Sequence, residues 1–353
     1  MSPAVPIARR SKSLSAQFGL TERIFASSED RATAASVEDG LALVEEGLLR
    51  ELSFSDSMAD VTSRYLMSAG GKRVRPMLTL LTAHLGDGVL PDVLTAAEAI
   101  EITHLASLYH DDVMDEAEKR RGVPSAQTVW GNSVAILTGD LLFARASKLI
   151  ASLGERAIML QAETFERLVL GQLNETAGPD AGEDPIEHYI DVLRNKTGSL
   201  IAAAGQMGVV FSNAAPEYEI AVMHFGERIG VAFQLVDDVL DLSPSSDETG
   251  KLAGTDLRAG VPTLPLLHLR RRAANDPAAA ELLARLDQGI DSGDSPEFGS
   301  AIEDLRRHAV TADTLAEAHR WAREAVEALD PLPAGSVKKA LVRFADVMVE
   351  RSS

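Results

Sequence analysis

Two acidic clusters with identical spacing are the residues most able to do chemistry. Residues 111–115 read DDVMD and residues 237–241 read DDVLD. The aspartates are Asp111, Asp112 and Asp115 in the first motif and Asp237, Asp238 and Asp241 in the second. In a helix, a spacing of four residues places the first and last aspartates on one face, one turn apart. Two ionised carboxylates about 5 Å apart repel each other by about 3 kcal/mol at an effective dielectric constant near 20.

Both clusters follow apolar sequence, so a solvated surface explains them poorly and a bound cation or shared protons would relieve the repulsion. Carboxylate ligands without cysteine or paired histidines favour Mg²⁺, with Mn²⁺ as a substitute. Because Mg²⁺ usually bridges to substrate phosphates, two such clusters indicate a diphosphate held between them. The alternative, an acidic helix end facing water, is weakened by the repetition of the motif.

Basic residues in glycine-containing segments supply candidate contacts for that diphosphate. Residues 70–76 (GGKRVRP) place Lys72, Arg73 and Arg75 before a predicted helix, with Pro76 at its first position. Lys119, Arg120 and Arg121 follow the first motif, and guanidinium groups suit phosphate oxygens. By themselves, Lys196-Thr197, Lys251 and the nearby Asp256 are weak signals.

The elements that must position these residues are helices. The chain has 353 residues, only 5% of them aromatic, and apolar residues recur at helical spacing from about Ser36 onward. We expect a helix over 186–204 and a loop over 287–296, and no convincing strand pattern is present. A single bundle of ten or more helices, as one all-α domain over residues 31–353, is the economical architecture.

Composition excludes several classes of partner. The formal net charge of −19 disfavours a nucleic acid. No apolar run is long enough for a transmembrane segment, and residues 1–30 are expected to form a flexible tail rather than a secretory signal. The absence of cysteine suits the cytoplasm.

The order and spacing of these motifs resemble the trans-isoprenyl (polyprenyl) diphosphate synthase family, and most of all its long-chain bacterial members. The resemblance runs from about residue 40 to the C-terminus. The segments that carry it are GGKRVRP (70–76), HLASLYHDDVMDEAEKRRG (104–122), GD (139–140), KTGSL (196–200), FQLVDDVLDLSPSSDETGKLAGTDL (233–257) and TLPLL (263–267). It implies a helical bundle around a central active-site cavity, and a homodimer.

The resemblance also implies a reaction. Allylic diphosphate would ionise with the help of Mg²⁺, isopentenyl diphosphate would attack the carbocation, and a proton would leave. All six motif aspartates would hold metal. Residues implied to contact the allylic substrate are Arg120, Lys196 (also a catalytic candidate), Thr197, Gln234 and Lys251. Residues implied to bind isopentenyl diphosphate are Lys72, Arg75, His104 and Arg121, with Arg73 close by.

Product length and one departure leave alternatives open. Family members with short products carry bulky aromatics at the fourth or fifth position before the first motif, where this chain has Ser107 and Ala106. A long product for a quinone side chain is therefore expected, unless Tyr109 turns inward. Val261 stands where the family usually has lysine, and Arg258 is a possible substitute. The alternatives are a short-chain synthase, a terpene cyclase (disfavoured by the second aspartate motif) and a non-catalytic partner subunit.

Overall fold

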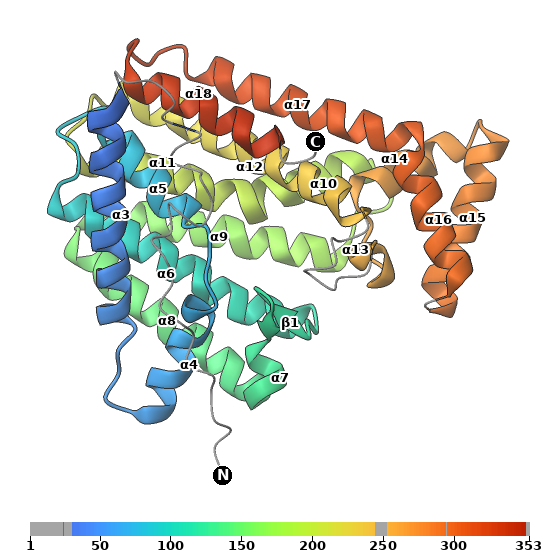
Figure 1. Cartoon of the computed structure of the whole chain (residues 1–353), viewed down its shortest axis with the longest axis horizontal. Helices are drawn as coiled ribbons and strands as arrows, with labels where there is room; N and C mark the ends of the chain where they lie inside the picture. Colours follow the sequence, from blue (N-terminus) through green and yellow to red (C-terminus); the bar gives the residue numbers. More distant parts are fainter. Residues whose placement is uncertain (1–23, 25–29, 244–252, 294, 351–353) are drawn as a thin grey trace. The chain divides into compact units, whose positions relative to one another are not determined.

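The computed structural model describes residues 24, 30–243, 253–293 and 295–350. The described chain is almost entirely helical, which confirms the all-α prediction (Figure 1). Its residues group into two compact units. Unit 1 comprises Met1–Thr164, Ala203–Met223 and Pro331–Leu341, and unit 2 comprises Phe165–Ala202, His224–Asp330 and Val342–Ser353. The extent of the single predicted domain stays a prediction.

Unit 1 holds the N-terminal helices and one small hairpin. Within it, α6 packs along α8 and also contacts α3, α5 and α7. The elements that lie wholly in this unit are α3 (Arg31–Glu51), α4 (Ser57–Ser68), α5 (Val74–Ala83), α6 (Pro91–Met114), β1 (Lys119–Arg120), β2 (Val123–Pro124), α7 (Ala126–Trp130) and α8 (Asn132–Ser152).

Unit 2 holds the C-terminal helices around a core of leucines, alanines and Phe298. In it, α14 packs on α10, α15 and α17, and α16 packs on α15 and α17. The elements wholly in this unit are α10 (Pro185–Leu193), the π-helical turn η2 (Arg194–Gly198), α13 (Thr255–Arg258), α14 (Leu264–Ala273), α15 (Pro277–Ser292), α16 (Pro296–Arg307) and α17 (Ala309–Ala328). Four helices contribute residues to both units: α9 (Glu155–Ala177), α11 (Ser199–Phe211), α12 (Glu217–Asp241) and α18 (Ser336–Val349).

Helix starts follow the local sequence. Asp56, Asp184, Asp276 and Ser295 each precede a helix and accept hydrogen bonds from amides of its first turn. Such caps satisfy donors that would otherwise have no partner within the helix. The α6 helix is different, because apolar residues cover most of its circumference and most of its side chains are buried. A helix that is apolar all round belongs in the interior, so α6 forms the centre of its unit.

Four sequence expectations were wrong in detail. Helix α5 begins at Val74, so Pro76 is its third residue and not its first. The residue before the helix is Arg73, whose φ is 48°. Helix α15 continues to Ser292, which shortens the loop expected over 287–296. Residues 119–124 form an antiparallel hairpin, although the sequence showed no convincing strand pattern. The helix expected over 186–204 is interrupted by η2.

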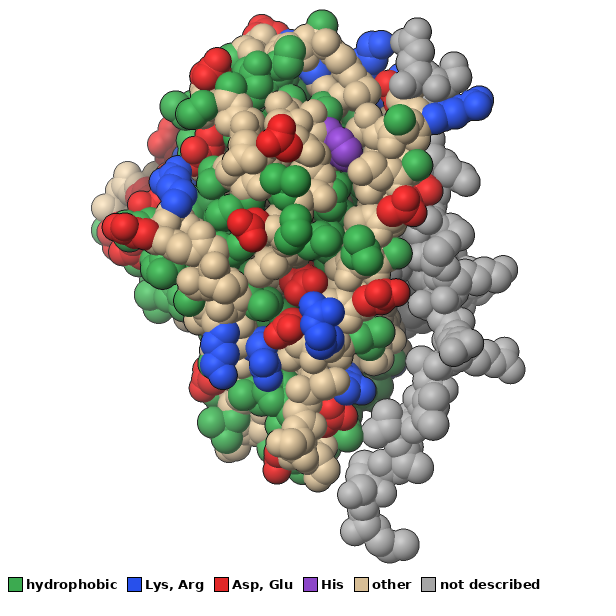
Figure 2. Space-filling model, turned by 90° about the vertical axis from the view of Figure 1, so that its left-hand side faces the viewer, with side chains coloured by type: hydrophobic (Ala, Val, Ile, Leu, Met, Phe, Trp, Pro, Cys, Tyr) green, Lys and Arg blue, Asp and Glu red, His purple; other side chains and the backbone are tan. Residues whose placement is uncertain are grey.

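The surface is mixed in character. Figure 2 shows one face on which hydrophobic side chains lie scattered among acidic and basic ones. Among the described residues, no helix is both long and apolar enough to cross a membrane. Most of the tail expected over residues 1–30 lies outside the described residues, and within that range Ile24 and Asp30 are buried.

Candidate active site

The first aspartate motif lies at the C-terminal end of α6. Asp112 is fully buried, and its Oδ1 accepts a hydrogen bond of 2.6 Å from Nε of Arg120. Its other oxygen, Oδ2, is buried without a hydrogen-bond partner. Burial raises the pKa of Asp112, and the adjacent Arg120 opposes that rise. Because the helix dipole also places partial negative charge at this end, the cluster favours a bound cation.

The hairpin after α6 explains how two arginines reach this region. In the hairpin, Arg120 pairs with Val123. Arg121 and Gly122 form its turn with φ values of 53° and 78°. Positive φ at both central residues is the geometry that tight two-residue hairpins need. The turn directs Arg121 back to α4, where its Nη1 donates to the carbonyl of Leu66 at 2.8 Å. Asp115 caps the end of α6 and is exposed.

Four arginines act electrostatically on His104. Burial is the main cause that holds the His104 pKa well below its usual value, followed by Arg75, Arg121, Arg73 and Arg120. Burial also lowers the pKa of Arg75 to about 10, with Glu101 opposing and Arg121 adding to the shift. Nε of Arg75 is buried without a hydrogen-bond partner. A cluster of arginines in a chain of net charge −19 is a suitable place for an anion.

Arg73 differs from its neighbours in this cluster. Its side chain is only 3% exposed and forms ion pairs of 2.5 Å to Glu45 and 3.2 Å to Glu101. Its Nη1 and Nη2 also donate to the carbonyls of Gly70 and Met67. The structure therefore ties Arg73 to carboxylates of α3 and α6, whereas Lys72 is partly exposed in the same loop.

The second aspartate motif closes α12 in unit 2. Asp238 is buried, and its Oδ2 accepts hydrogen bonds from the Tyr189 hydroxyl at 2.8 Å and from the Leu264 amide at 3.3 Å. Its Oδ1 is buried without a partner. Burial raises the pKa of Asp238 to about 7, opposed by the Tyr189 and Leu264 hydrogen bonds. This motif therefore repeats the arrangement of the first, with one aspartate oxygen fixed by the protein and the other unpaired.

The remaining members of the second motif lie beside it. Both carboxylate oxygens of Asp241 accept backbone amides, from Thr255 at 3.2 Å and Asp256 at 3.1 Å, so Asp241 caps the short helix α13. Asp237 and Gln234 are partly buried on α12. Lys251 lies outside the described residues.

Lys196 and Thr197 lie within η2, where the helix widens by one residue. The Lys196 ammonium pairs with Glu175 of α9 at 2.5 Å. A π-helical turn inside a longer helix is frequent at functional sites, because it displaces side chains from the regular helical rows. Both residues are partly buried, so they remain open to a ligand.

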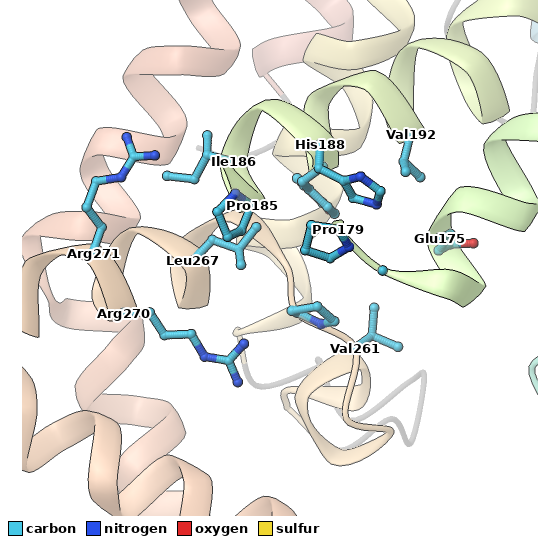
Figure 3. A pocket seen from close by; sticks show the side chains of 13 residues that line it. Glu175, Pro179, Pro185, Ile186, His188, Val192, Val261, Leu267, Arg270 and Arg271 are labelled. Atoms are coloured by element: carbon cyan, nitrogen blue, oxygen red, sulfur yellow. The ribbon is translucent and has the colours of Figure 1, made fainter. Parts of the chain in front are cut away.

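A cavity of about 380 Å³ in unit 2 is lined by Val261, Tyr189 and Glu175 among mostly apolar residues (Figure 3). Val261 is 37% exposed. Arg258 lies with its guanidinium 5.3 Å from the centre of the Phe298 ring and donates to the carbonyl of Ala253. That placement gives no support to Arg258 as a replacement for the missing lysine.

The predicted chain-length residues lie on α6. Ala106 is fully buried and Ser107 is nearly so. The Tyr109 hydroxyl donates to the carbonyl of Thr62 and accepts from the Leu66 amide, and burial raises its pKa. These bonds anchor the Tyr109 ring to α4.

The donor set fits a hard divalent cation. Among the described residues, no three histidine, aspartate or glutamate side chains already converge as a metal site. However, Asp112 and Asp238 each retain a buried oxygen without a partner, and carboxylate oxygens are the ligands that Mg²⁺ prefers. The two motifs belong to different units, so the binding of one diphosphate by both motifs stays a prediction.

Two residues of the site were missed in the sequence. Tyr189 binds an aspartate 49 residues further along the chain, and Glu175 pairs with a lysine 21 residues further on. Neither lies in a segment that the family motifs cover, and no local spacing reports such distant contacts.

Comparisons with known proteins agree on one family. The polyprenyl synthetase family model matches residues 57–295. The chain is 44% identical over 328 residues to nonaprenyl diphosphate synthase of Mycobacterium tuberculosis, covering 91% of this chain and 95% of that protein. A geranylgeranyl pyrophosphate synthase structure from Corynebacterium glutamicum, with calcium and isoprenyl diphosphate, is 43% identical with a TM-score of 0.78. The match covers 90% of this chain and 96% of that chain. A polyprenyl synthase structure from Caulobacter crescentus, with the same ligands, is 30% identical with a TM-score of 0.81. The match covers 98% of this chain and 100% of that chain.

Proposed function

The chain belongs to the polyprenyl synthetase family and is a prenyltransferase, and we propose that it uses Mg²⁺ to add isopentenyl diphosphate units to an allylic diphosphate. The observation that carries this proposal is the adjacency of acidic and cationic groups in unit 1. Asp112 of α6 accepts a hydrogen bond from Arg120, and Asp111 contributes to the electrostatics of Arg75. Such a pairing suits a diphosphate bound partly through a divalent ion and partly through guanidinium groups.

The proposed reaction breaks the allylic C–O bond, and diphosphate leaves as an anion. The motif aspartates would hold Mg²⁺, which would neutralise part of the charge that develops on this leaving group. The alkene of isopentenyl diphosphate then forms a C–C bond with the carbocation, and a proton passes to the released diphosphate. No protein nucleophile is needed. The chain binds and orients the two substrates and excludes water from them.

The side chains divide this work. The six motif aspartates hold metal, with Arg120, Lys196, Thr197, Gln234 and Lys251 on the allylic diphosphate. Arg75, Arg121, Lys72 and His104 hold isopentenyl diphosphate. In the structure without substrate, burial and the neighbouring arginines hold the pKa of His104 well below its usual value.

We propose a long product that serves as a quinone side chain. Ala106 and Ser107 are small, and Tyr109 is tied to α4 by its hydroxyl, which leaves no aromatic ring free at these positions to end the growing chain. The nonaprenyl diphosphate synthase of M. tuberculosis supports a long product. The geranylgeranyl pyrophosphate synthase of C. glutamicum, of similar identity, keeps the short-chain alternative open.

The test is incubation of the purified protein with Mg²⁺, isopentenyl diphosphate and farnesyl diphosphate, followed by mass spectrometry of the products. We expect all-trans products longer than 20 carbons. Products that stop at 20 carbons would favour the short-chain alternative. No elongation by the protein alone would favour a non-catalytic partner subunit.

We also propose a homodimer in the cytoplasm. Helix α9 exposes a row of apolar side chains that includes Phe165, Val169, Leu170 and Leu173. Contiguous exposed apolar surface of this kind is typical of protein interfaces. Light scattering of the purified protein measures the mass, and a monomer would contradict the proposal.

A further inference from the structure

The π-helical turn η2 is held by one face of α9. Arg167, Gly171 and Glu175 are spaced by four residues, so they share that face. Nε of Arg167 donates to the Asn195 side chain at 3.1 Å. Glu175 pairs with the ammonium of Lys196 at 2.5 Å. Three successive turns of α9 therefore contact two successive residues of η2.

Gly171 allows the backbones to touch. A Cβ added there would lie 2.7 Å from the backbone nitrogen of Lys196 and 3.1 Å from the carbonyl carbon of Asn195. Backbone atoms cannot rotate away as a flexible side chain does, so any side chain at this position must displace η2. Glycine at position 171 is thus a condition for the observed path of the turn.

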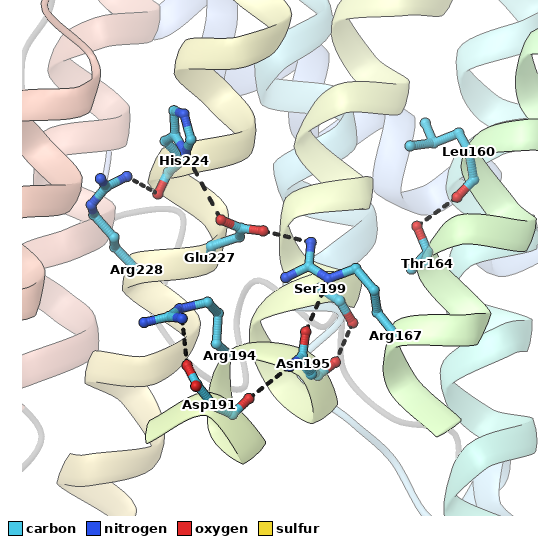
Figure 4. Close-up of polar contacts among 10 residues, drawn as sticks. All are labelled: Leu160, Thr164, Arg167, Asp191, Arg194, Asn195, Ser199, His224, Glu227 and Arg228. Atoms are coloured by element: carbon cyan, nitrogen blue, oxygen red, sulfur yellow. Dashed lines mark hydrogen bonds and ion pairs between the residues drawn. The ribbon is translucent and has the colours of Figure 1, made fainter. Parts of the chain in front are cut away.

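The turn meets a second close contact from α12. A Cβ added at Gly230 would lie 2.6 Å from Cα of Gly198, the last residue of η2. The Arg167 guanidinium connects the two sides, because its Nη1 pairs with Glu227 of α12 at 2.5 Å while Nε binds Asn195 (Figure 4). Asn195 in turn donates to the carbonyl of Asp191, one turn earlier.

We propose that Arg167 and Gly171 are positioning residues that fix η2 and so place Lys196 and Thr197 for contact with the allylic diphosphate. This inference rests on the proposed function, which assigns those two residues to that substrate. A planar guanidinium that donates to Asn195 and Glu227 at once locks the turn between α9 and α12. A lysine ammonium has no such fork, so Arg167→Lys is not a conservative change.

The test compares Gly171→Ala and Arg167→Lys with wild type in steady-state kinetics and hydrogen exchange. We expect the KM for farnesyl diphosphate to rise about tenfold, the equivalent of one charge-assisted hydrogen bond, with the KM for isopentenyl diphosphate unchanged. Amides of residues 195–199 should exchange faster in both variants. Gly299→Ala is the matched control: it adds a methyl group to another helical glycine with no heavy atom within 4 Å, and we expect wild-type kinetics.

The two readouts separate this inference from the proposed function. Inactive wild-type protein would refute the function, while faster exchange at residues 195–199 in the variants would still support the positioning of η2. A folded Gly171→Ala protein with wild-type KM for farnesyl diphosphate would overturn the inference. Equal increases in both KM values would also overturn it, because they would indicate general damage. Arg167→Lys adds no atoms to the close contact, so it tests the inference even if Gly171→Ala does not fold.

Discussion

Replacement of Arg73 by methionine should lower the stability of the fold, because Arg73 pairs with carboxylates of the protein. Arg73 carries a buried positive charge between Glu45 and Glu101, and the Glu101 side chain is only 2% exposed. In Arg73→Met, Glu101 remains in the interior without its partner. Breaking one side of a buried ion pair costs about 3–5 kcal/mol.

The magnitude sets the expected melting temperature. For large domains, 1 kcal/mol corresponds to about 2–4 °C, so we expect Arg73→Met to melt on the order of 10 °C below wild type. The double variant Arg73→Met/Glu101→Gln should recover part of that loss, because it removes the unpaired charge as well. Arg156→Met is the control, since Arg156 is 53% exposed in its ion pair and exposed pairs contribute about 0–1 kcal/mol.

Differential scanning calorimetry measures the melting temperatures of wild type and of the three variants, and kinetics of the folded variants give KM for isopentenyl diphosphate. The reasoning would be refuted if Arg73→Met kept the wild-type melting temperature while its KM for isopentenyl diphosphate rose. That result would assign the Arg73 guanidinium to the substrate and not to the fold.

Three further predictions concern other parts of the chain. Tyr189→Phe removes a hydrogen bond to the Asp238 carboxylate, and such a bond contributes about 1.5–3 kcal/mol for a charged partner. The Mg²⁺ concentration for half-maximal activity should therefore rise. An unchanged Mg²⁺ titration would contradict a role of Tyr189 in holding Asp238 for the metal. Ala106→Phe should shorten the product, as measured by mass spectrometry, and an unchanged product length would contradict the assignment of the growing chain to α6. Burial raises the pKa of Glu98 from 4.5 to about 7, so the stability that protonated Glu98 contributes is lost as pH rises through that window. The free energy of unfolding of Glu98→Gln should therefore be close to that of wild type at pH 5 and higher at pH 8, by up to about 3 kcal/mol. Urea denaturation at both pH values measures this difference, and a difference independent of pH would contradict the assignment.

The helices and the ends of the two aspartate motifs were predictable because they depend on local order. An apolar segment precedes each aspartate motif in the sequence, and α6 and α12 are the helices that end at these two motifs. The hairpin over residues 119–124 was not predictable, because each of its strands has two residues and shows no alternation.

The interruption at η2 could not be inferred from residues 186–204 alone. Its path depends on Gly171 and Gly230, which belong to other helices and meet the turn only in the folded chain. The difference between Arg73 and Arg75 has the same origin. Both are arginines of one basic loop, yet only the tertiary fold brings Glu45 and Glu101 to Arg73.

The proposed function depends most on the motif aspartates, each motif holding divalent ions that bind the allylic diphosphate. Isothermal titration calorimetry with an unreactive thio-analogue of farnesyl diphosphate tests it most directly, with and without Mg²⁺. Wild type should bind only with Mg²⁺, and Asp111→Asn/Asp112→Asn and Asp237→Asn/Asp238→Asn should each weaken binding at least about 100-fold, the loss of roughly two charge-assisted contacts. Tight binding without metal, or wild-type affinity after either motif is changed, would contradict the account.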